Sequence, residues 1–392
     1  MHLVDTTLFY SPTSGGVKRY LTAKHAWLAS HGSWTHSILV PGAREHIERG
    51  GICSVEGYPV PGTFNYRLPL NPRRWTQLLD ELEPDLIEVG DAFHPAWCAS
   101  RVAQRRGIPL AAFYHSNLPQ IIGRRIGSTS ERAIGRYVRW LYERFDVVFA
   151  PSRLMCGYLS SLGVHHTAHQ PLGVDAEIFY PGQRVLDLRE KLALSRDTRL
   201  LVYAGRFAGE KNVPVLLQAF AKLGRPYHLL LLGGEREARP TSNITLLPYR
   251  RDCVELAQWL ASADALVHAG TKETFGLVIL EAMACGRPVV AARAGAIPEI
   301  VDHSIGMLAA SSSAASMAEA IVGLYERDIE AIGAAARARV LQRFTWAQAF
   351  QSQMNTYLSL PALRARRAIP DSRLHHSPRR QLAEAEDLNP AG

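Results

Sequence analysis

Short apolar segments alternate with helix-like segments along most of the chain, and this rhythm constrains the fold more than any other feature. In the first half, strand patterns are predicted over residues 2–10, 37–40, 85–89, 110–114 and 147–150. Helical patterns lie between them over residues 18–31, 72–82, 96–106 and 131–145. Strands that alternate with helices at this spacing indicate βαβ units and therefore a parallel sheet.

The second half repeats the same rhythm. Strand patterns follow over residues 200–203, 228–232, 244–247, 265–268 and 289–292, with helical patterns over 213–223, 253–262 and 276–284. We therefore predict an α/β fold of two doubly wound, Rossmann-like domains, over residues 1–170 and 183–345, with a linker over 171–182. Sheets of this kind bind ligands at the carboxyl ends of their strands, so the cleft between the domains should hold the active site.

Composition narrows the classes of protein. Of the 392 residues, 47% are hydrophobic and 20% are charged, and no apolar run approaches the ~18 residues of a membrane-spanning helix. The five cysteines are scattered, so we expect no disulfide framework and no zinc site, but a reducing cytoplasm. The net charge of +8 comes without a nucleic-acid-binding signature, so we expect no nucleic-acid partner. Residues 361–392 lack apolar periodicity and are predicted to be a disordered tail.

The strongest candidate site lies around two glutamates, Glu273 and Glu281, with seven residues between them. A loop between them opens onto a predicted helix near Gly276. A helix N-terminus offers unpaired N–H groups and a positive dipole end, which suit a phosphate, and a glycine there permits close approach. Glu281 could then reach ribose hydroxyls, and Glu273 could face a sugar. The spacing alone nevertheless favours ordinary roles, with Glu281 solvated and Glu273 capping the helix.

Three weaker candidates also follow predicted strands. Arg206 and Lys211 share one loop, and two cations on a loop suit a diphosphate, although isolated surface cations are common. The Gly15-Gly16 pair resembles a phosphate cradle, but a tight turn is the simpler explanation. His115 ends an apolar run over the cleft and could contact the transferred sugar, while a lone histidine is more often a structural hydrogen-bonding group.

The residues around these candidates resemble the retaining glycosyltransferases of the GT-B fold, family 4. Residues 273–290 read ETFGLVILEAMACGRPVV, which is similar to the E-x7-E motif of that family. The resemblance extends over about residues 8–350, with G-R-x-x-x-x-K at 205–211, G-V-D-x-x-x-F at 173–179, A-D-x-x-V at 263–267 and F-[ST]-W at 344–346. It implies an acceptor-binding first domain, a second domain that binds a nucleotide sugar, and a helix over residues 346–360 that crosses back to the first domain.

The resemblance also implies roles for individual residues. Arg206 and Lys211 would bind the donor diphosphate and, with His115 and Glu273, form the catalytic group. The implied donor-binding set is Gly15, Gly16, Gly205, Arg206, Lys211, Gly233, Tyr249, Arg250, Glu273, Thr274, Phe275, Gly276, Leu277 and Glu281. The chain contains no D-x-D pair, so these cations and a helix N-terminus would replace a divalent ion, and we expect no metal and no cofactor besides the nucleotide-sugar donor.

The local sequences VHAGTKETFGL and FYHSNLP look most like mannosyltransferases that use GDP-mannose and lipid-type acceptors, with a UDP-hexose as the alternative donor. We therefore predict a retaining hexosyltransferase that moves mannose to a hydroxyl of a lipid or glycan. One departure is that His268-Ala269-Gly270 stand where the family often has Pro-Ser, which would reshape the sugar pocket. Two other classes stay open. A sugar-nucleotide epimerase or hydrolase of GT-B type would consume the donor without an acceptor, and a non-catalytic binder of nucleotide sugars or anionic surfaces would never transfer.

Membrane contact is a separate question, posed by the predicted helix over residues 128–145. Ile134, Val138, Leu141 and Phe145 form an apolar stripe, and several arginines lie mostly off it. A basic amphipathic helix can rest on an anionic leaflet, which would place the protein peripherally on the inner face of the cytoplasmic membrane. The simpler explanation is that the stripe packs on the sheet and the arginines are solvated.

Overall fold

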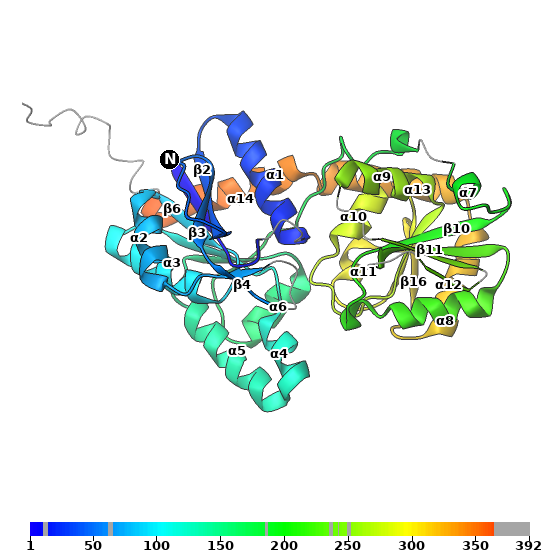
Figure 1. The fold of residues 1–392 in the computed structure, drawn as a ribbon, viewed down its shortest axis with the longest axis horizontal. Coiled ribbons are helices and arrows are strands. Elements are labelled where there is room, and N and C mark those ends of the chain that lie inside the picture. The colour runs from blue at the N-terminus through cyan, green and yellow to red at the C-terminus, as the bar shows by residue number, and fades with distance from the viewer. Residues whose placement is uncertain are drawn as a thin grey trace, which may run out of the picture.

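The computed structural model describes residues 1–10, 15–61, 66–184, 187–234, 238–241, 243–248 and 252–363. They form two lobes that lie side by side, each with a seven-stranded sheet between helices (Figure 1). The predicted α/β fold of two doubly wound, Rossmann-like domains is confirmed. The predicted tail lies outside the described residues from residue 364 onward.

The first lobe contains a parallel sheet in the order β3-β2-β1-β6-β7-β8-β9. Its strands are β1 (His2–Thr6), β2 (Thr35–Gly42), β3 (Ile52–Glu56), β6 (Leu86–Val89), β7 (Leu110–Phe113), β8 (Val147–Ala150) and β9 (Thr167–His169). Its helices are α1 (Gly16–His31), α2 (Pro72–Glu81), α3 (His94–Arg106), α4 (Leu118–Ile126), α5 (Ser128–Tyr142) and α6 (Arg153–Ser161), beside a hairpin of β4 (Tyr58–Pro59) and β5 (Arg67–Leu68). Every residue of β6, β7 and β8 is buried, as expected for parallel strands covered on both faces.

The second lobe contains a sheet in the order β12-β13-β11-β10-β14-β15-β16, in which only β12 is antiparallel to its neighbour. Its strands are β10 (Arg199–Ala204), β11 (Tyr227–Gly234), β12 (Ala238–Thr241), β13 (Ile244–Pro248), β14 (Ala265–His268), β15 (Val289–Ala292) and β16 (Gly306–Ala309). Its helices are α7 (Leu188–Lys191), α8 (Val213–Leu223), α9 (Cys253–Ser262), α10 (Leu277–Ala284), α11 (Ile297–Ile300), α12 (Ala314–Tyr325) and α13 (Ile329–Arg343). Two short 3-10 turns lie at Pro181–Gln183 and Gly209–Lys211.

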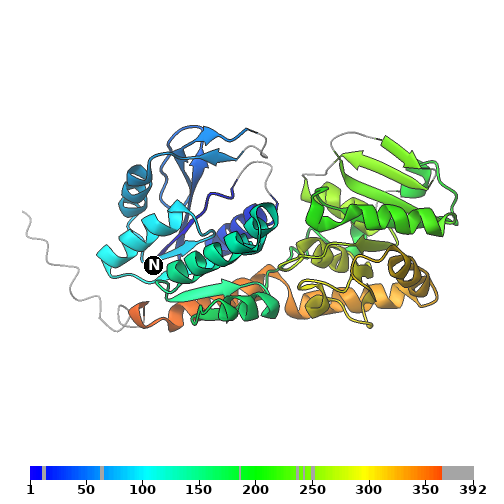
Figure 2. The ribbon, with the colours of Figure 1, turned by 90° about the horizontal axis from the view of Figure 1, so that it is seen from below.

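The last described helix, α14 (Trp346–Ser359), leaves the second lobe and packs on α1 of the first lobe (Figure 2). A capping box starts it, because Thr345 and Gln348 exchange side-chain-to-backbone hydrogen bonds. Within α14 the Phe350 ring stacks on Trp346 at 5.2 Å between centroids, and it lies 5.8 Å from the Tyr20 ring of α1. The exact domain boundaries at residues 170 and 183 stay a prediction.

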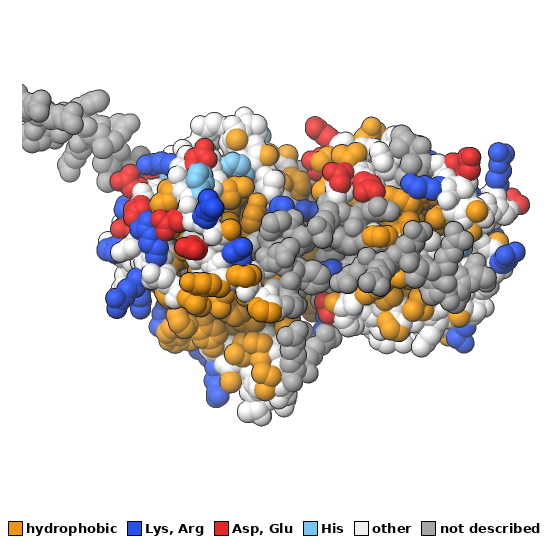
Figure 3. Space-filling view, viewed as in Figure 1, with side chains coloured by type: hydrophobic (Ala, Val, Ile, Leu, Met, Phe, Trp, Pro, Cys, Tyr) orange, Lys and Arg blue, Asp and Glu red, His pale blue; other side chains and the backbone are white. Residues whose placement is uncertain are grey.

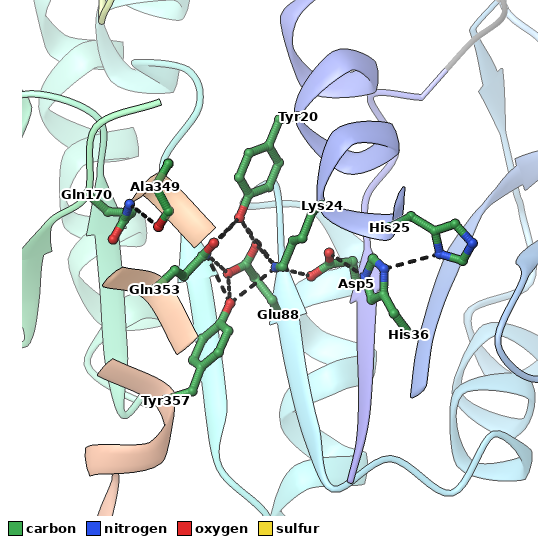
Figure 4. Close-up of polar contacts among 10 residues, drawn as sticks. All are labelled: Asp5, Tyr20, Lys24, His25, His36, Glu88, Gln170, Ala349, Gln353 and Tyr357. Carbon is green, nitrogen blue, oxygen red and sulfur yellow. Dashed lines mark hydrogen bonds and ion pairs between the residues drawn. The ribbon is translucent and has the colours of Figure 1, made fainter. Parts of the chain in front are cut away.

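A buried polar cluster joins α14 to the first sheet (Figure 4). Lys24 of α1 is completely buried, and its Nζ lies 3.0 Å from Asp5 Oδ1 and 2.9 Å from Glu88 Oε1. From α14, Gln353 Nε2 donates to Glu88 Oε2 at 2.7 Å, and the Tyr357 hydroxyl donates to the same carboxylate. Buried charges are tolerated only when they are paired and hydrogen-bonded. The cluster therefore fixes α14 against charged groups of β1, α1 and β6.

Candidate active site

A cleft of about 980 Å³ lies between the two lobes, at the carboxyl ends of strands from both sheets. Most of the predicted site residues line it: Gly15, Gly16, His115, Gly205, Arg206, Lys211, Glu273, Thr274, Phe275, Gly276, Leu277 and Glu281. Gly233 is absent from this lining and packs beneath it, since a Cβ on Gly233 would lie 1.9 Å from the Gly205 carbonyl oxygen. Tyr249 and Arg250 lie outside the described residues.

Glu273 lies in the loop between β14 and α10, and its side chain is 12% exposed. Its Oε1 contacts Lys211 Nζ, and His268 Nε2 lies 2.8 Å from the same oxygen. Burial raises the pKa of the Glu273 carboxyl, but Lys211 and His268 outweigh burial and hold the pKa well below its usual range. Glu273 is thus a carboxylate at physiological pH. It does not cap α10, whose first turn has no side-chain cap.

His268 is a candidate that the sequence showed only as a departure from the family motif. It ends β14, is 1% exposed, and its ring lies parallel to the Tyr203 ring at 6.0 Å between centroids. Donation to a carboxylate requires a proton on Nε2, while Nδ1 has no partner among the described residues. A Cβ on Gly270 would lie 2.6 Å from His268 Nε2, so glycine at this position leaves room for the contact. A histidine at a strand end, five residues before the motif glutamate, is the signal that could have found it.

Helix α10 begins in the cleft. Its N-cap residue, Gly276, has a φ of +105°, a left-handed conformation that favours glycine. Glu281 lies within this helix at 3% exposure, and its Oε1 contacts Arg19 of α1 in the other lobe. Glu281 Oε2 has no partner among the described residues. The first N–H groups of α10 can bind a phosphate, and the Glu281 carboxylate can accept a hydrogen bond from a ribose hydroxyl. The helix start therefore suits a phosphate that is joined to a ribose.

His115 follows β7 and faces the same cleft from the first lobe. Its ring stacks on Phe113 at 4.3 Å and meets the Tyr20 ring edge-on at 5.0 Å, both between centroids. Burial lowers the pKa of His115 to about 3, so the imidazole is neutral at physiological pH. Its carbonyl oxygen accepts from Thr274 Oγ1 at 3.3 Å, which joins the loops of the two lobes directly.

The glycine pair at the start of α1 faces the start of α10. Gly15 is the N-cap residue of α1, and no side chain caps that helix either. A Cβ on Gly16 would lie 3.2 Å from Leu277 Cδ1, so the two helix starts approach one another closely. Beside them, the Tyr203 hydroxyl donates to the Arg206 carbonyl oxygen at 2.9 Å and fixes the loop that carries this exposed arginine. Two helix N-termini and two cations thus face the cleft, an arrangement that favours an anionic ligand.

Two family models match the chain, one in each lobe. The model described as Glycosyltransferase Family 4 covers residues 14–178, and the model described as Glycosyl transferases group 1 covers residues 198–327. A GDP-mannose-dependent alpha-(1-6)-phosphatidylinositol dimannoside mannosyltransferase of Mycobacterium tuberculosis is 30% identical over 373 residues, which cover 91% of this chain and 96% of the relative. The chain belongs to glycosyltransferase family 4.

Other relatives of this family 4 glycosyltransferase include a GDP-mannose-dependent alpha-mannosyltransferase of Corynebacterium glutamicum, 26% identical over 280 residues, with 69% of this chain and 67% of the relative covered. Sucrose-phosphate synthase from Thermosynechococcus elongatus superposes with a TM-score of 0.76 at 22% identity and covers 91% of this chain and 98% of its own. Anabaena HepE in complex with UDP and glucose gives a TM-score of 0.72 at 20% identity, with 91% and 99% covered. The GT-B fold and a glycosyltransferase activity with a nucleotide-sugar donor are thereby confirmed.

Proposed function

We propose that this family 4 glycosyltransferase moves mannose from GDP-mannose to a hydroxyl of a lipid or glycan, with retention of the anomeric configuration. The observation that carries the proposal is the contact between Thr274 and the His115 carbonyl oxygen at 3.3 Å, because it brings the donor loop against the first-lobe loop. The two mannosyltransferase relatives favour mannose and GDP, and a UDP-hexose is the alternative donor.

The donor would bind mainly to the second lobe. Arg206 and Lys211 would bind its diphosphate together with the first N–H groups of α10, since all of them face the cleft. Glu281 Oε2, for which the described residues supply no donor, would accept a hydrogen bond from a ribose hydroxyl. Glu273 would accept hydrogen bonds from hydroxyls of the hexose. Because Glu273 contacts Lys211, the sugar site would lie beside the diphosphate site.

Transfer would occur on a single face of the sugar. The acceptor oxygen bonds to the anomeric carbon as the bond to the diphosphate breaks, and the acceptor proton passes to the departing phosphate oxygen. Lys211 and His268 engage Glu273, which makes this carboxylate a poor covalent nucleophile. His115, neutral because burial lowers its pKa to about 3, would orient a hydroxyl by hydrogen bonding and take no full charge.

We further propose that transfer requires no divalent ion. Arg206, Lys211 and the start of α10 supply positive charge where the diphosphate departs. Among the residues that the structure describes, no group of three or more His, Cys, Asp or Glu side chains is placed to hold a metal ion. Turnover should therefore persist in EDTA, and a full loss that Mg²⁺ restores would reject this part of the proposal.

The first lobe also offers a surface for peripheral membrane contact. The apolar stripe predicted over residues 134–145 is not that surface, because Val138 and Leu141 of α5 and Phe145 just after it are at most 2% exposed and pack in the core. In the described part of the chain, no helix has the length and apolar character to span a membrane.

Apolar side chains do gather on the first lobe between α3 and α5 (Figure 3). Trp97 and Trp140 are 49% and 48% exposed, and Tyr137 links them with ring centroids 6.3 Å and 6.1 Å away. Amphipathic aromatic rings beside exposed arginines such as Arg136 suit an anionic interface. We propose contact with the inner face of the cytoplasmic membrane here, and Trp97→Ala/Trp140→Ala should bind anionic vesicles more weakly in flotation assays.

Product analysis tests the central proposal. The enzyme is incubated with GDP-mannose or UDP-glucose, with and without a lipid or glycan acceptor, and the released nucleotide and the anomeric configuration of the product are measured. We expect acceptor-dependent release of GDP and an α-linked product. Equal donor consumption without acceptor would favour the epimerase or hydrolase class, an inverted product would refute retention, and donor binding without turnover would favour a non-catalytic binder.

A further inference from the structure

Asn117, on the first-lobe side of the cleft, has a buried side-chain amide whose nitrogen, Nδ2, lacks a hydrogen-bond partner among the described residues. The residue is 7% exposed and lines the cleft. Its Oδ1 accepts from the Gln120 backbone N–H at 3.3 Å, which caps α4, and from the Tyr114 hydroxyl at 3.2 Å. Because a backbone N–H can only donate, the amide oxygen must face Gln120, and this fixes Nδ2 in the other position. Nδ2 has no partner among the described residues.

A buried donor that stays unpaired is costly, so such a group in a substrate cleft calls for a ligand that accepts from it. The buried carboxylate on the same side, Asp91, is engaged by the protein itself. Its Oδ2 accepts from Thr7 Oγ1 at 2.8 Å and from Leu8 N at 2.6 Å, and its Oδ1 accepts from Phe93 N at 3.0 Å. Asp91 therefore fixes the loop after β6, whereas Asn117 offers a donor to a ligand.

Three aromatic residues line the same side of the cleft. The Phe9 ring meets Tyr66 at 6.0 Å and Phe93 at 5.7 Å between centroids, edge to face in both cases. We define Phe9, Tyr66 and Phe93 as the aromatic wall. An apolar wall and a buried amide donor that line the same cleft fit a ring that carries hydroxyls at its rim and C–H groups on its faces.

We propose that Asn117 binds a hydroxyl oxygen of the acceptor through Nδ2, and that the acceptor presents a polyhydroxylated ring to the aromatic wall. This inference rests on the proposed function and narrows its acceptor. A lone alcohol at the end of an aliphatic chain would not use both features together. Asn117 lies two residues after His115, whose carbonyl oxygen contacts Thr274 at 3.3 Å, so a ring bound there lies beside the donor loop.

Asn117→Asp tests the proposal, because it keeps the oxygen that Gln120 and Tyr114 engage and replaces the Nδ2 donor with an acceptor. Asn71→Asp is the matched control. Asn71 caps α2 through the equivalent contact, with Arg74 N at 3.1 Å from its Oδ1, and it does not line the cleft. The probes are methyl α-D-mannopyranoside and cyclohexanol, each followed by saturation-transfer NMR in the presence of GDP.

We expect the wild type and Asn71→Asp to bind the mannoside, and Asn117→Asp to bind it at least about tenfold more weakly. GDP affinity and melting temperature should stay unchanged, and cyclohexanol should bind weakly throughout. Equal mannoside binding by the wild type and Asn117→Asp, or none by the wild type, would overturn the proposal. A parallel loss of GDP binding and melting temperature would show a structural role and overturn it as well.

Two further measurements separate this inference from the proposed function. If mannoside binding depends on Asn117 but the protein transfers no sugar from GDP-mannose, the proposed function fails and the acceptor subsite stands. If Glu273→Gln abolishes mannoside binding while Asn117→Asp leaves it intact, the probe occupies the donor-sugar site and the subsite proposal is wrong.

Discussion

Glu281 is the residue at which the donor site can be tested most sharply. It is 3% exposed, its Oε1 contacts Arg19, and its Oε2 has no partner among the described residues. A hydrogen bond from a ribose hydroxyl to this carboxylate should contribute about 1.5–3 kcal/mol, as hydrogen bonds to charged groups do. Since 1.4 kcal/mol corresponds to a factor of ten, Glu281→Ala should weaken GDP binding by roughly 10- to 150-fold.

Isothermal titration calorimetry with GDP and with 2′,3′-dideoxy-GDP measures this effect. The wild type should prefer GDP, whereas Glu281→Ala should bind both nucleotides alike, because the ribose hydroxyls have lost their partner. Glu319→Gln is the control, since Glu319 is an exposed glutamate of α12 in the same lobe and does not line the cleft.

Two results would refute the reasoning about Glu281. If Glu281→Ala binds GDP as tightly as the wild type does, the carboxylate makes no contact with the nucleotide. If it loses the same factor for both nucleotides, the carboxylate acts through its contact with Arg19 and not through the ribose hydroxyls.

Three other features give predictions. Burial lowers the pKa of His115 from 6.5 to about 3. The pH profile of kcat should therefore have the same shape near pH 6.5 in the wild type and in His115→Gln. In the unfolded chain His115 takes up a proton near pH 6.5, whereas in the folded chain it does so only near pH 3. The free energy of unfolding, measured in urea, should therefore fall as the pH is lowered from 6.5 to about 3, and it should fall less steeply in His115→Gln. Lys24→Met should lower the free energy of unfolding by about 3–5 kcal/mol, because two buried carboxylates lose the ammonium group that pairs with both, and an unchanged urea midpoint would contradict this. His268→Phe should lower kcat more than His268→Gln, which can still donate to Glu273, and equal kcat values would reject a positioning role.

The central strands of both sheets could be predicted because nearly all of their residues are buried and apolar. β7 and β8 are covered on both faces, so they read as uninterrupted apolar runs between polar turns. The edge strand β9 was missed, because its three residues include none that is buried, and its sequence carries no strand signal. Residues 293–343 were left without predicted elements, although they hold α11, β16, α12 and α13. In α13 alanines surround the helix, so the apolar residues do not form a clear stripe.

The candidate site could be predicted as a set of residues but not as a set of contacts. Carboxyl ends of parallel strands meet at one edge of a sheet, so motif residues after different strands had to converge. The partners could not be derived in the same way. Lys211 and Glu273 are 62 residues apart, and Arg19 and Glu281 are 262 apart, so only the folded chain shows that they meet. Asn117 lies within the quoted FYHSNLP segment but was not singled out, because a missing hydrogen bond is visible only once every neighbour is placed.

Helix α1 explains why the site depends on parts of the chain that never enter the cleft. Gly16, Tyr20 and Lys24 follow one another at intervals of four residues and therefore share a face of the helix. Gly16 approaches α10, the Tyr20 ring supports His115 at 5.0 Å, and Lys24 is buried in the cluster that fixes α14. Tyr20 also belongs to that buried cluster, since its hydroxyl donates to Glu88 Oε1 at 2.7 Å. The same side chain therefore contacts both His115 and the cluster. A helix from the end of the chain thus helps to hold the ring that faces the donor loop, which gives the return of α14 to the first lobe a functional reason.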